Sequence, residues 1–304
     1  MTYPYETTVK NITDSCITEA LDGLTLKQSP LRGLFSQLLR PPIRRFAHQV
    51  TLADMHMIEG YLDQGARMLL ERLVTSCTPA GTQNIPDTGP LLVTANHPGG
   101  LEILASLAHL HRPDVYMVSL DQPILRAMPN AASHMIYLGK DPASRAVNIR
   151  QVIERLQAGC AVLIFPAGQM EPDPAATPGA LEFLQNWSNS TGLFLSKVPS
   201  TLHLPVAVRG VIGPRAINFL FARHKPTLKG RQRVASFSQI IMQMLRKDAW
   251  PIDMRIVFGQ PAPVHQLAPT PEARALAEAV RQRERALLST LNPLPFTEPF
   301  KGPQ

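Results

Sequence analysis

The chain has few cysteines and no long apolar run. Its three cysteines, Cys16, Cys77 and Cys160, stand far apart among 304 residues and form no CxxC pair. This pattern fits free thiols in a reducing compartment. No uncharged apolar stretch approaches the roughly 20 residues that span a bilayer, and no cationic start followed by an apolar segment opens the chain. We therefore expect a cytoplasmic protein, peripheral on the inner face of a membrane.

Motifs of several enzyme classes are also missing. There is no GxSxG sequence, which argues against an α/β-hydrolase. There is no HExxH sequence and no Cys/His cluster, so we expect no metal and no resident cofactor. A composition of 44% hydrophobic and 17% charged residues is that of a globular protein, and 304 residues suffice for one large α/β domain or two small ones.

Acidic residues are absent from two long stretches of a chain whose net charge is +7. The first lies between Asp22 and Asp54, and the second between Glu182 and Asp248. Their basic residues are Lys27, Arg32, Arg40, Arg44 and Arg45, and then Lys197, Arg209, Arg215, Arg223, Lys225, Lys229, Arg231, Arg233, Arg246 and Lys247. Regions of one sign attract phospholipid headgroups, phosphorylated substrates or nucleic acid. A solvated face that keeps the protein soluble is the alternative.

The first 85 residues predict an N-terminal helical segment. Apolar residues recur at helical spacing over 31–39, and Pro41-Pro42 is expected to end that helix. An apolar stripe rimmed by arginines is typical of a helix that lies on an anionic membrane, although a core-packed helix with a basic outer face has the same pattern. A second helix is predicted over 53–77. The apolar basic segment 212–247 is a further candidate for membrane contact.

From residue 86 to residue 292 the pattern predicts an α/β domain with a mainly parallel central sheet flanked by helices. Short apolar runs predict strands at 91–95, 115–118, 135–138, 161–165, 204–208 and 254–258. Helices are predicted between them, most clearly after the N-cap Asp141, and a last helix begins after Thr270. Strands that alternate with helices favour parallel pairing. A proline-rich tail occupies residues 293–304.

One segment, NHPGGLE at residues 96–102, has the residue types of a catalytic site. It lies between a predicted buried strand and a helix, and ligands of open α/β sheets bind at the carboxyl ends of strands. Glu102 can fix the tautomer of His97 and stabilise the cation that forms when the imidazole takes up a proton. The amides of Gly99 and Gly100 are expected to face a ligand. The alternative is an ordinary turn with a capping histidine and an exposed glutamate.

A second turn, FPAGQME at residues 165–171, also follows a predicted buried strand. It should therefore open at the same edge of the sheet as the first turn. We expect amides near Gly168 to hold a phosphate or a developing oxyanion. Glu171 is a carboxylate near this site, with a solvated loop position as the favoured alternative.

Four blocks together resemble the glycerolipid acyltransferase family, typified by the lysophosphatidate acyltransferases. They are NHPGGLE (96–102), MIYLGK (135–140), VLIFPAG (162–168) and LPVAV (204–208). The family has the blocks NHxxxxD, an apolar block that ends in a basic residue, FPEGTR, and an apolar block with proline, in this order and at similar spacing. The resemblance covers residues from about 90 to 210.

The resemblance implies a role for each matching residue. His97 is the general base that deprotonates the acceptor, and Glu102 orients its imidazole. Asn96 matches the first block, Lys140 or the nearby Arg145 the basic residue of the second, Phe165, Pro166 and Gly168 the third, and Pro205 the fourth. Our candidates for substrate binding are Asn96, Lys140, Arg145, Phe165, Pro166 and Gly168, together with Gly99, Gly100 and Glu171, a carboxylate to which the family pattern assigns no role. The implied donor is acyl-CoA or acyl-carrier protein, and the implied acceptor is a lysophospholipid, glycerol phosphate or a related lipid. An anionic membrane surface is an expected partner, and nucleic acid is not.

Three departures from the family pattern concern the acceptor more than the chemistry. Glu102 replaces aspartate, Ala167 replaces the glutamate of FPEG, and Gln169-Met170 replaces Thr-Arg. The FPAG form resembles the branch that makes amino-acid-derived lipids or carries haemolysin-like names, whose acceptor need not be glycerol phosphate. Two other functions stay open: an acyl-thioester hydrolase, in which the same base activates water, and a non-catalytic protein that binds anionic lipid.

Overall fold

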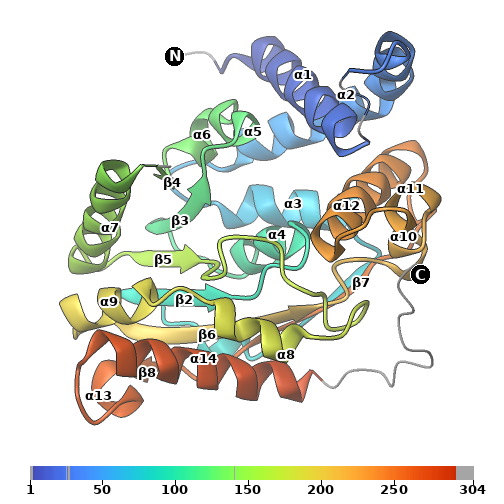
Figure 1. Ribbon diagram of the computed structural model, residues 1–304. Helices are drawn as coiled ribbons and strands as arrows, with labels where there is room; N and C mark the ends of the chain where they lie inside the picture. Colours follow the sequence, from blue (N-terminus) through green and yellow to red (C-terminus); the bar gives the residue numbers. More distant parts are fainter. Residues whose placement is uncertain (1–2, 25, 27, 140, 292–304) are drawn as a thin grey trace.

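The chain folds as an α/β protein around one eight-stranded sheet in a computed structural model, which describes residues 3–24, 26, 28–139 and 141–291 (Figure 1). The strand order is β1-β7-β6-β2-β5-β3-β4, and β8 pairs with β6. The strands are β1 (Ser76–Ala80), β2 (Leu91–Ala95), β3 (Val115–Leu120), β4 (Met135–Leu138), β5 (Ala161–Ile164), β6 (Leu202–Arg209), β7 (Asp253–Phe258) and β8 (Ala262–Pro263).

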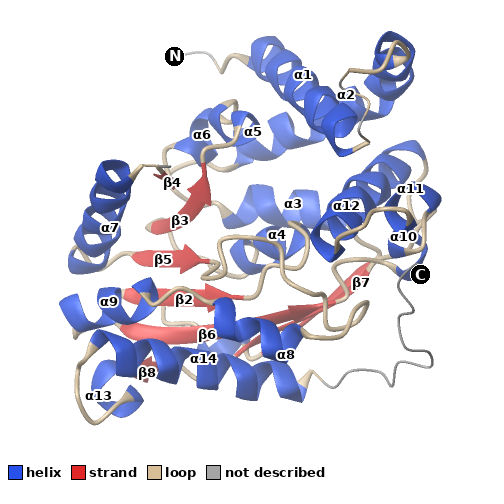
Figure 2. Cartoon of the chain, viewed as in Figure 1, coloured by secondary structure: helices blue, strands red, loops and turns tan. Residues whose placement is uncertain are grey.

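Helices cover both faces of the sheet (Figure 2). The longer helices are α1 (Tyr5–Gly23), α2 (Arg32–His56), α3 (Asp63–Leu73), α4 (Leu101–Leu107), α7 (Pro142–Gln157), α9 (Ser190–Lys197), α12 (Leu228–Leu245) and α14 (Ala273–Thr290). Alternate residues of each buried strand point to opposite faces. Leu91 and Val93 accordingly pack with α1 to α4 and α12, whereas Leu92 packs with α7, α9 and α14.

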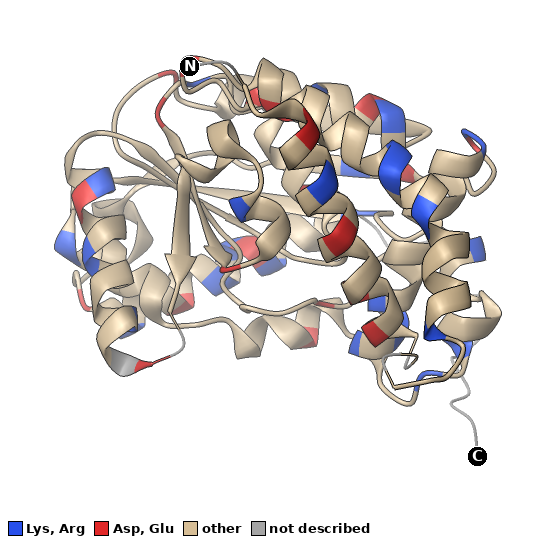
Figure 3. Ribbon diagram, turned by 90° about the horizontal axis from the view of Figure 1, so that it is seen from above, with Lys and Arg blue, Asp and Glu red and all other residues tan. Residues whose placement is uncertain are grey.

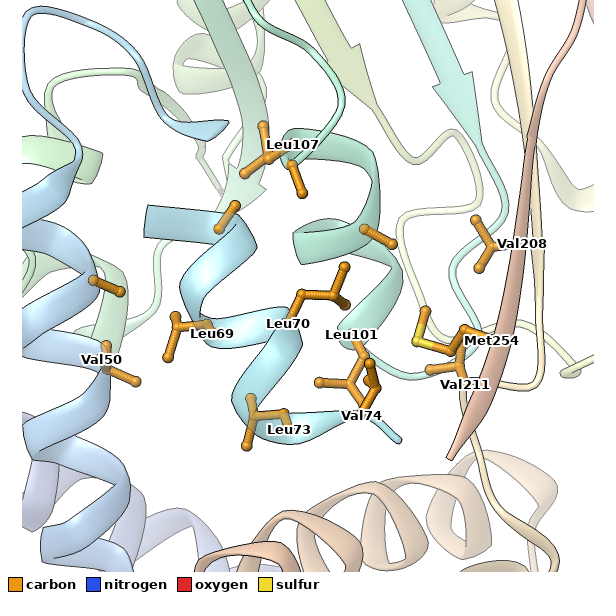
Figure 4. Packing of buried hydrophobic residues seen from close by; sticks show 14 of the residues in the cluster. Val50, Leu69, Leu70, Leu73, Val74, Leu101, Leu107, Val208, Val211 and Met254 are labelled. Carbon is orange, nitrogen blue, oxygen red and sulfur yellow. The ribbon is translucent and has the colours of Figure 1, made fainter. Parts of the chain in front are cut away.

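The larger core fills the space between α3, α4 and the sheet. Figure 4 shows Leu69, Leu70 and Leu73 of α3 in the same packed region as Leu101 of α4 and Met254 of β7. Each of these side chains is buried. The helix that follows the NHPGGLE turn is thus fixed on its inner face by packing, which gives that turn a rigid base.

The predicted fold class is confirmed, and the six predicted strands form β2 to β7. Neighbouring strands run parallel except where β6 meets β7 and β8. The sequence did not reveal β1, because this edge strand is mostly exposed, contains Pro79 and has no apolar run. Since β1 lies within residues 1–85, this segment contributes to the central sheet as well as to the helices; the boundary after residue 85 stays a prediction. The proline-rich tail lies outside the described residues.

The prediction that Pro41-Pro42 ends a helix is wrong. Helix α2 continues through both prolines to His56. A proline inside a helix costs about 3 kcal/mol, because it removes a hydrogen bond and crowds the preceding turn. Ile43, Ala47 and Val50 follow the prolines and are buried in the larger core, so packing of the second half of the helix offsets this cost.

The predicted helix over 53–77 is also wrong, since α2 ends at His56 and α3 spans Asp63–Leu73. Glu59 and Gly60 between them have φ of 53° and 85°, which a right-handed helix does not accommodate. A Cβ on Gly60 would lie 2.1 Å from the carbonyl oxygen of Pro113. The loop that contains Pro113 packs against Gly60 and so determines where the helix is interrupted. The spacing of apolar residues along the sequence carries no information about this contact.

Membrane contact through a spanning helix finds no support in the described part of the chain. None of its helices combines the length and the hydropathy that crossing a bilayer requires.

Glu284 of α14 is a polar group in the core. It has no exposed surface, and neither carboxyl oxygen has a hydrogen-bond partner among the described residues. Burial and the nearby charge of Glu171 raise the pKa of Glu284 well above its ordinary value, against a smaller opposing effect of Arg283. The folded protein therefore keeps this carboxyl protonated at pH values where the unfolded chain ionises it.

We predict that Glu284→Met raises the free energy of unfolding. Removing an unsatisfied buried carboxyl should contribute about 1–3 kcal/mol. Because the folded-state pKa is raised, wild-type stability falls as pH rises above the unfolded value near 4.5, so the gain should be larger at pH 8 than at pH 5. Urea unfolding at both pH values measures it. Glu284→Gln, which cannot ionise, should make the free energy of unfolding less dependent on pH without the gain from an apolar side chain. A Glu284→Met variant that is less stable than the wild type at pH 8 would contradict the prediction.

Candidate functional site

The two turns singled out in the sequence open side by side. They follow β2 and β5, which are parallel neighbours with Thr94 paired to Ile164. The carboxyl ends of parallel strands lie at the same edge of a sheet, so residues 96–102 and 165–171 meet there. The main-chain amide of Glu171 donates to the carbonyl oxygen of His97 at 2.8 Å, which joins the two loops directly.

The imidazole of His97 is paired with the carboxylate of Glu102. Nδ1 of His97 makes a short hydrogen bond with Oε1 of Glu102, whose side chain has no exposed surface, while the histidine side chain is 22% exposed. The geometry excludes the alternative of an exposed glutamate. A carboxylate on Nδ1 holds the proton there and leaves Nε2 as the basic nitrogen.

Glu102 also accepts hydrogen bonds from the amides at the start of its own helix. Gly99 N–H donates to Oε2 at 3.2 Å, and Gly100 N–H donates to Oε2 at 2.6 Å. Gly100 has a φ of 110°, which favours glycine. The prediction that the amides of Gly99 and Gly100 are free to face a ligand is therefore wrong, because both donate to Glu102. The amide of Gly168 is likewise engaged, by the carbonyl oxygen of Phe165 at 3.0 Å.

The surroundings of His97 favour its charged form. Burial lowers the pKa of His97, but the charge of Glu102, its hydrogen bond to Nδ1 and the charge of Glu171 outweigh burial and raise the pKa above its ordinary value. The ring of Phe165 lies against the imidazole, with centroids 4.9 Å apart and planes tilted by 36°. His97 is therefore a partly buried, oriented base that is stabilised after it takes up a proton.

Asn96 ties β2 to β6. Its amide nitrogen donates to the carbonyl oxygen of Val208, and its oxygen accepts the N–H of Val208, both at 2.8 Å. The side chain is buried, and both of its polar ends are used in this pair. Asn96 thus fixes the residue next to His97 to the neighbouring strand. Its substrate-binding role stays a prediction.

Glu171 is 1% exposed, so the solvated loop position favoured in the sequence is wrong. Its Oε1 accepts the amide N–H of His97 at 3.1 Å, and its Oε2 accepts the indole N–H of Trp187 at 3.0 Å. Burial raises the pKa of Glu171 to about 7, although these hydrogen bonds and the charge of His97 act in the opposite direction. A second carboxylate therefore lies beside His97, within the protein.

Strand β4, which holds most of the second sequence block, lies at the opposite edge of the sheet from β1 and is not a neighbour of β2. Two strands, β5 and β3, separate β4 from β2, which corresponds to ~14 Å at the usual strand spacing. Arg145 is exposed on α7, and Lys140 lies outside the described residues. Their roles in binding a substrate stay predictions, as do those of Pro166 and Gly168.

Three residues that support the site were not identified from the sequence. Trp187 donates to Glu171, and Gln232 of α12 donates to the carbonyl oxygens of Pro98 (3.1 Å) and Glu171 (2.8 Å). Asp173 is fully buried and accepts the amides of Gly210 (2.9 Å) and Ile212 (2.8 Å). No local motif marks Trp187 or Gln232. Asp173 lies two residues after the second turn. A further carboxylate so close to the site was the only feature of the sequence that could have indicated its role.

Within the described residues, no group of three or more His, Cys, Asp or Glu side chains is placed to hold a metal ion. Two hollows of about 410 and 510 Å³ occur elsewhere on the surface. The first lies along α14 and the second along α2, and arginines line both of them.

Among the solved structures that this chain resembles is the crystal structure of the 1-acyl-sn-glycerophosphate (LPA) acyltransferase PlsC from Thermotoga maritima. The TM-score is 0.45 and the sequence identity 16%, over 92% of this chain and 98% of that chain. No protein-family model matches the chain, and no curated protein matches it. Neither the family of the chain nor its reaction follows from this similarity.

We predict that the His97 imidazole titrates above pH 6.5 and that Glu102→Gln lowers its midpoint. The substitution removes the charge that favours the imidazolium while it keeps the size of the side chain. NMR titration of the imidazole signal, assigned by its loss in His97→Ala, measures the midpoint. An unchanged midpoint in Glu102→Gln would show that the pair does not set the protonation of His97.

Proposed function

We propose that the protein is an acyltransferase that moves a fatty acyl group from a thioester donor, acyl-CoA or acyl-carrier protein, to a lipid acceptor. The observation that carries the proposal is the pair of His97 with the fully buried Glu102 at the carboxyl edge of the sheet. The acceptor is a lysophospholipid, glycerol phosphate or a related lipid with a free hydroxyl or amine. The order of the four sequence blocks supports the same reaction.

In the proposed reaction, Nε2 of His97 takes the proton of the acceptor while the acceptor oxygen or nitrogen attacks the thioester carbonyl carbon. The new C–O or C–N bond forms, the C–S bond breaks, and the imidazolium returns its proton to the departing thiolate. Glu102 stabilises the imidazolium in between. This sequence needs no covalent intermediate on the protein.

The developing oxyanion needs donors other than the amides of Gly99, Gly100 and Gly168, which already have acceptors. On the loop after β5, the amides of Gln169 and Met170 have no acceptor in the described part of the chain. They belong to the loop that is hydrogen bonded to His97 through Glu171. We assign these two amides as the candidate oxyanion donors.

An exposed apolar stripe supports a membrane surface as the place of reaction. Leu31, Leu34 and Leu38, at the start of α2, are 52%, 64% and 68% exposed, and they share one helix face by their spacing. Leu220 and Phe221 of α11 (Leu220–Arg223) are also exposed, and α11 packs on α12, which in turn packs on α2. We propose that these residues lie on the inner face of an anionic membrane.

The charge around this stripe is mixed. Figure 3 views the molecule from the side of α1 and α2 and shows Lys and Arg on several helices, with acidic residues among them. Asp14 of α1 pairs with Arg40 at 3.3 Å, and Glu19 is close enough to Arg233 for the two charges to interact. The hollow along α2 nevertheless presents three arginines, Arg40, Arg44 and Arg45, which suits phosphate headgroups.

We predict that the protein releases thiol from acyl-CoA or acyl-carrier protein only when a lysolipid acceptor is present, with one acylated lipid formed per thiol. His97→Ala should lower kcat by about 10²–10⁴-fold, because the general base is lost. His265→Ala, at an exposed histidine of α13 (Val264–Leu267), is the matched control. Thiol release that ignores every acceptor would identify a hydrolase instead.

We predict that the protein floats with vesicles that contain anionic lipid and that Leu34→Glu/Leu38→Glu weakens this binding at least about tenfold, through lost apolar burial and added repulsion. Val147→Glu replaces a comparably exposed residue on α7 and should leave binding unchanged. Equal binding to neutral and anionic vesicles would contradict the electrostatic part, and equal binding of the double variant would contradict the assigned surface.

A further inference from the structure

Glu171 is hydrogen bonded to both polar groups of the His97 main chain. Its N–H donates to the carbonyl oxygen of His97 at 2.8 Å, and its carboxylate Oε1 accepts the N–H of His97 at 3.1 Å. A pair of bonds in opposite directions restrains both the position and the tilt of this residue. Since the imidazole leaves the chain through the Cα–Cβ bond of His97, these bonds also orient the ring.

Glu171 is itself fixed on every side. Oε2 accepts the indole N–H of Trp187 at 3.0 Å, and the carbonyl oxygen accepts Nε2 of Gln232 at 2.8 Å. The same Gln232 nitrogen donates to the carbonyl oxygen of Pro98, next to His97. Each polar atom of Glu171 thus has a protein partner, and the residue is 1% exposed. Its burial leaves it almost no surface with which to contact a substrate.

The charge of Glu171 also acts on His97. The titratable groups that face this pair are Glu102 on α4 and Glu284 on α14, while α12 contributes the neutral Gln232. Burial raises the pKa of Glu284 well above its ordinary value, so the charges that favour a protonated His97 come from Glu102 and, above its own pKa of about 7, from Glu171. One carboxylate, Glu102, is hydrogen bonded to the ring of His97, and the other, Glu171, to its main chain. Both favour the protonated imidazole.

We propose that Glu171 is a positioning residue, which fixes the His97 main chain in both directions and adds to Glu102 the negative charge that a protonated His97 requires. This role of Glu171 rests on the proposed function only in one respect, namely that acyl transfer is the reaction in which His97 acts. The arrangement itself concerns the ring of His97 and can be tested without any substrate.

The first test uses Glu171→Gln and NMR of the substrate-free protein. The amide group keeps one acceptor oxygen but sets an NH₂ against either the His97 or the Trp187 donor, and it removes the charge. The His97 midpoint should fall, and exchange of the His97 amide proton should accelerate at least about tenfold. Glu182→Gln, at an exposed glutamate, should change neither. An unchanged midpoint together with unchanged exchange would overturn the proposal.

Trp187→Phe provides a second variant that keeps the carboxylate. The indole N–H lowers the pKa of Glu171, so its loss leaves Glu171 more protonated near neutral pH. The His97 midpoint should therefore fall by less than in Glu171→Gln. This variant decides the proposal if Glu171→Gln does not fold, since a midpoint equal to that of the wild type would then overturn it.

Kinetics separate positioning from substrate binding. Glu171→Gln should lower kcat by about 10–100-fold with KM changed less than about threefold, and it should shift the acid limb of the pH profile to lower pH. A raised KM with an unchanged acid limb would mean that Glu171 binds substrate and would overturn the assignment. If the wild type transfers no acyl group, the proposed function fails while the NMR experiments still decide the role of Glu171.

Discussion

The site depends on the burial of one carboxylate. Glu102 has no exposed surface, and an isolated charge in such a place is strongly disfavoured. Three donors meet it: the imidazole of His97 and the amides of Gly99 and Gly100. The glycines can supply their amides because Gly100 adopts a φ of 110° at the start of α4. The same contacts that satisfy Glu102 therefore also fix which nitrogen of His97 is free to act.

Around this centre the structure joins neighbouring strand ends by side chains. Asn96 ties β2 to β6, Glu171 ties the loop after β5 to His97, and Asp173 ties that loop to the amides after β6. Each neutral bond contributes about 0.5–1.5 kcal/mol, and bonds to a charged group contribute more. Their common effect is rigidity at the edge of the sheet, which is what a base needs to meet its substrate in one geometry.

The surface that we propose for membrane contact is built differently from the site. The leucines of α2 stay exposed because the buried face of this helix lies beyond the prolines, where Ile43, Ala47 and Val50 reach the core. Helix α1 sets carboxylates against stretches that carry only positive charge in the sequence. In our proposal, attraction to anionic lipid rests on Arg44 and Arg45, which line the hollow along α2, and on the apolar stripe. Both belong to the surface that we propose for membrane contact.

The sequence by itself determined the strands β2 to β7 and the two turns that hold the candidate site residues. Apolar runs and helical spacing are local properties, so they located β2 to β7, the helix capped by Asp141, and the neighbouring positions of residues 96–102 and 165–171. Glu102 was identified as the partner of His97 because it follows five positions later, at the start of a helix.

Only the tertiary structure decided the features that depend on contacts between segments far apart in the sequence. The edge strand β1, the continuation of α2 through Pro41-Pro42 and the break at Gly60 depend on packing against distant segments. The burial of Glu171 depends on Trp187 and Gln232, which lie 16 and 61 residues away. A loop glutamate and a buried one have the same local sequence, and the difference arises where other elements exclude water and supply donors.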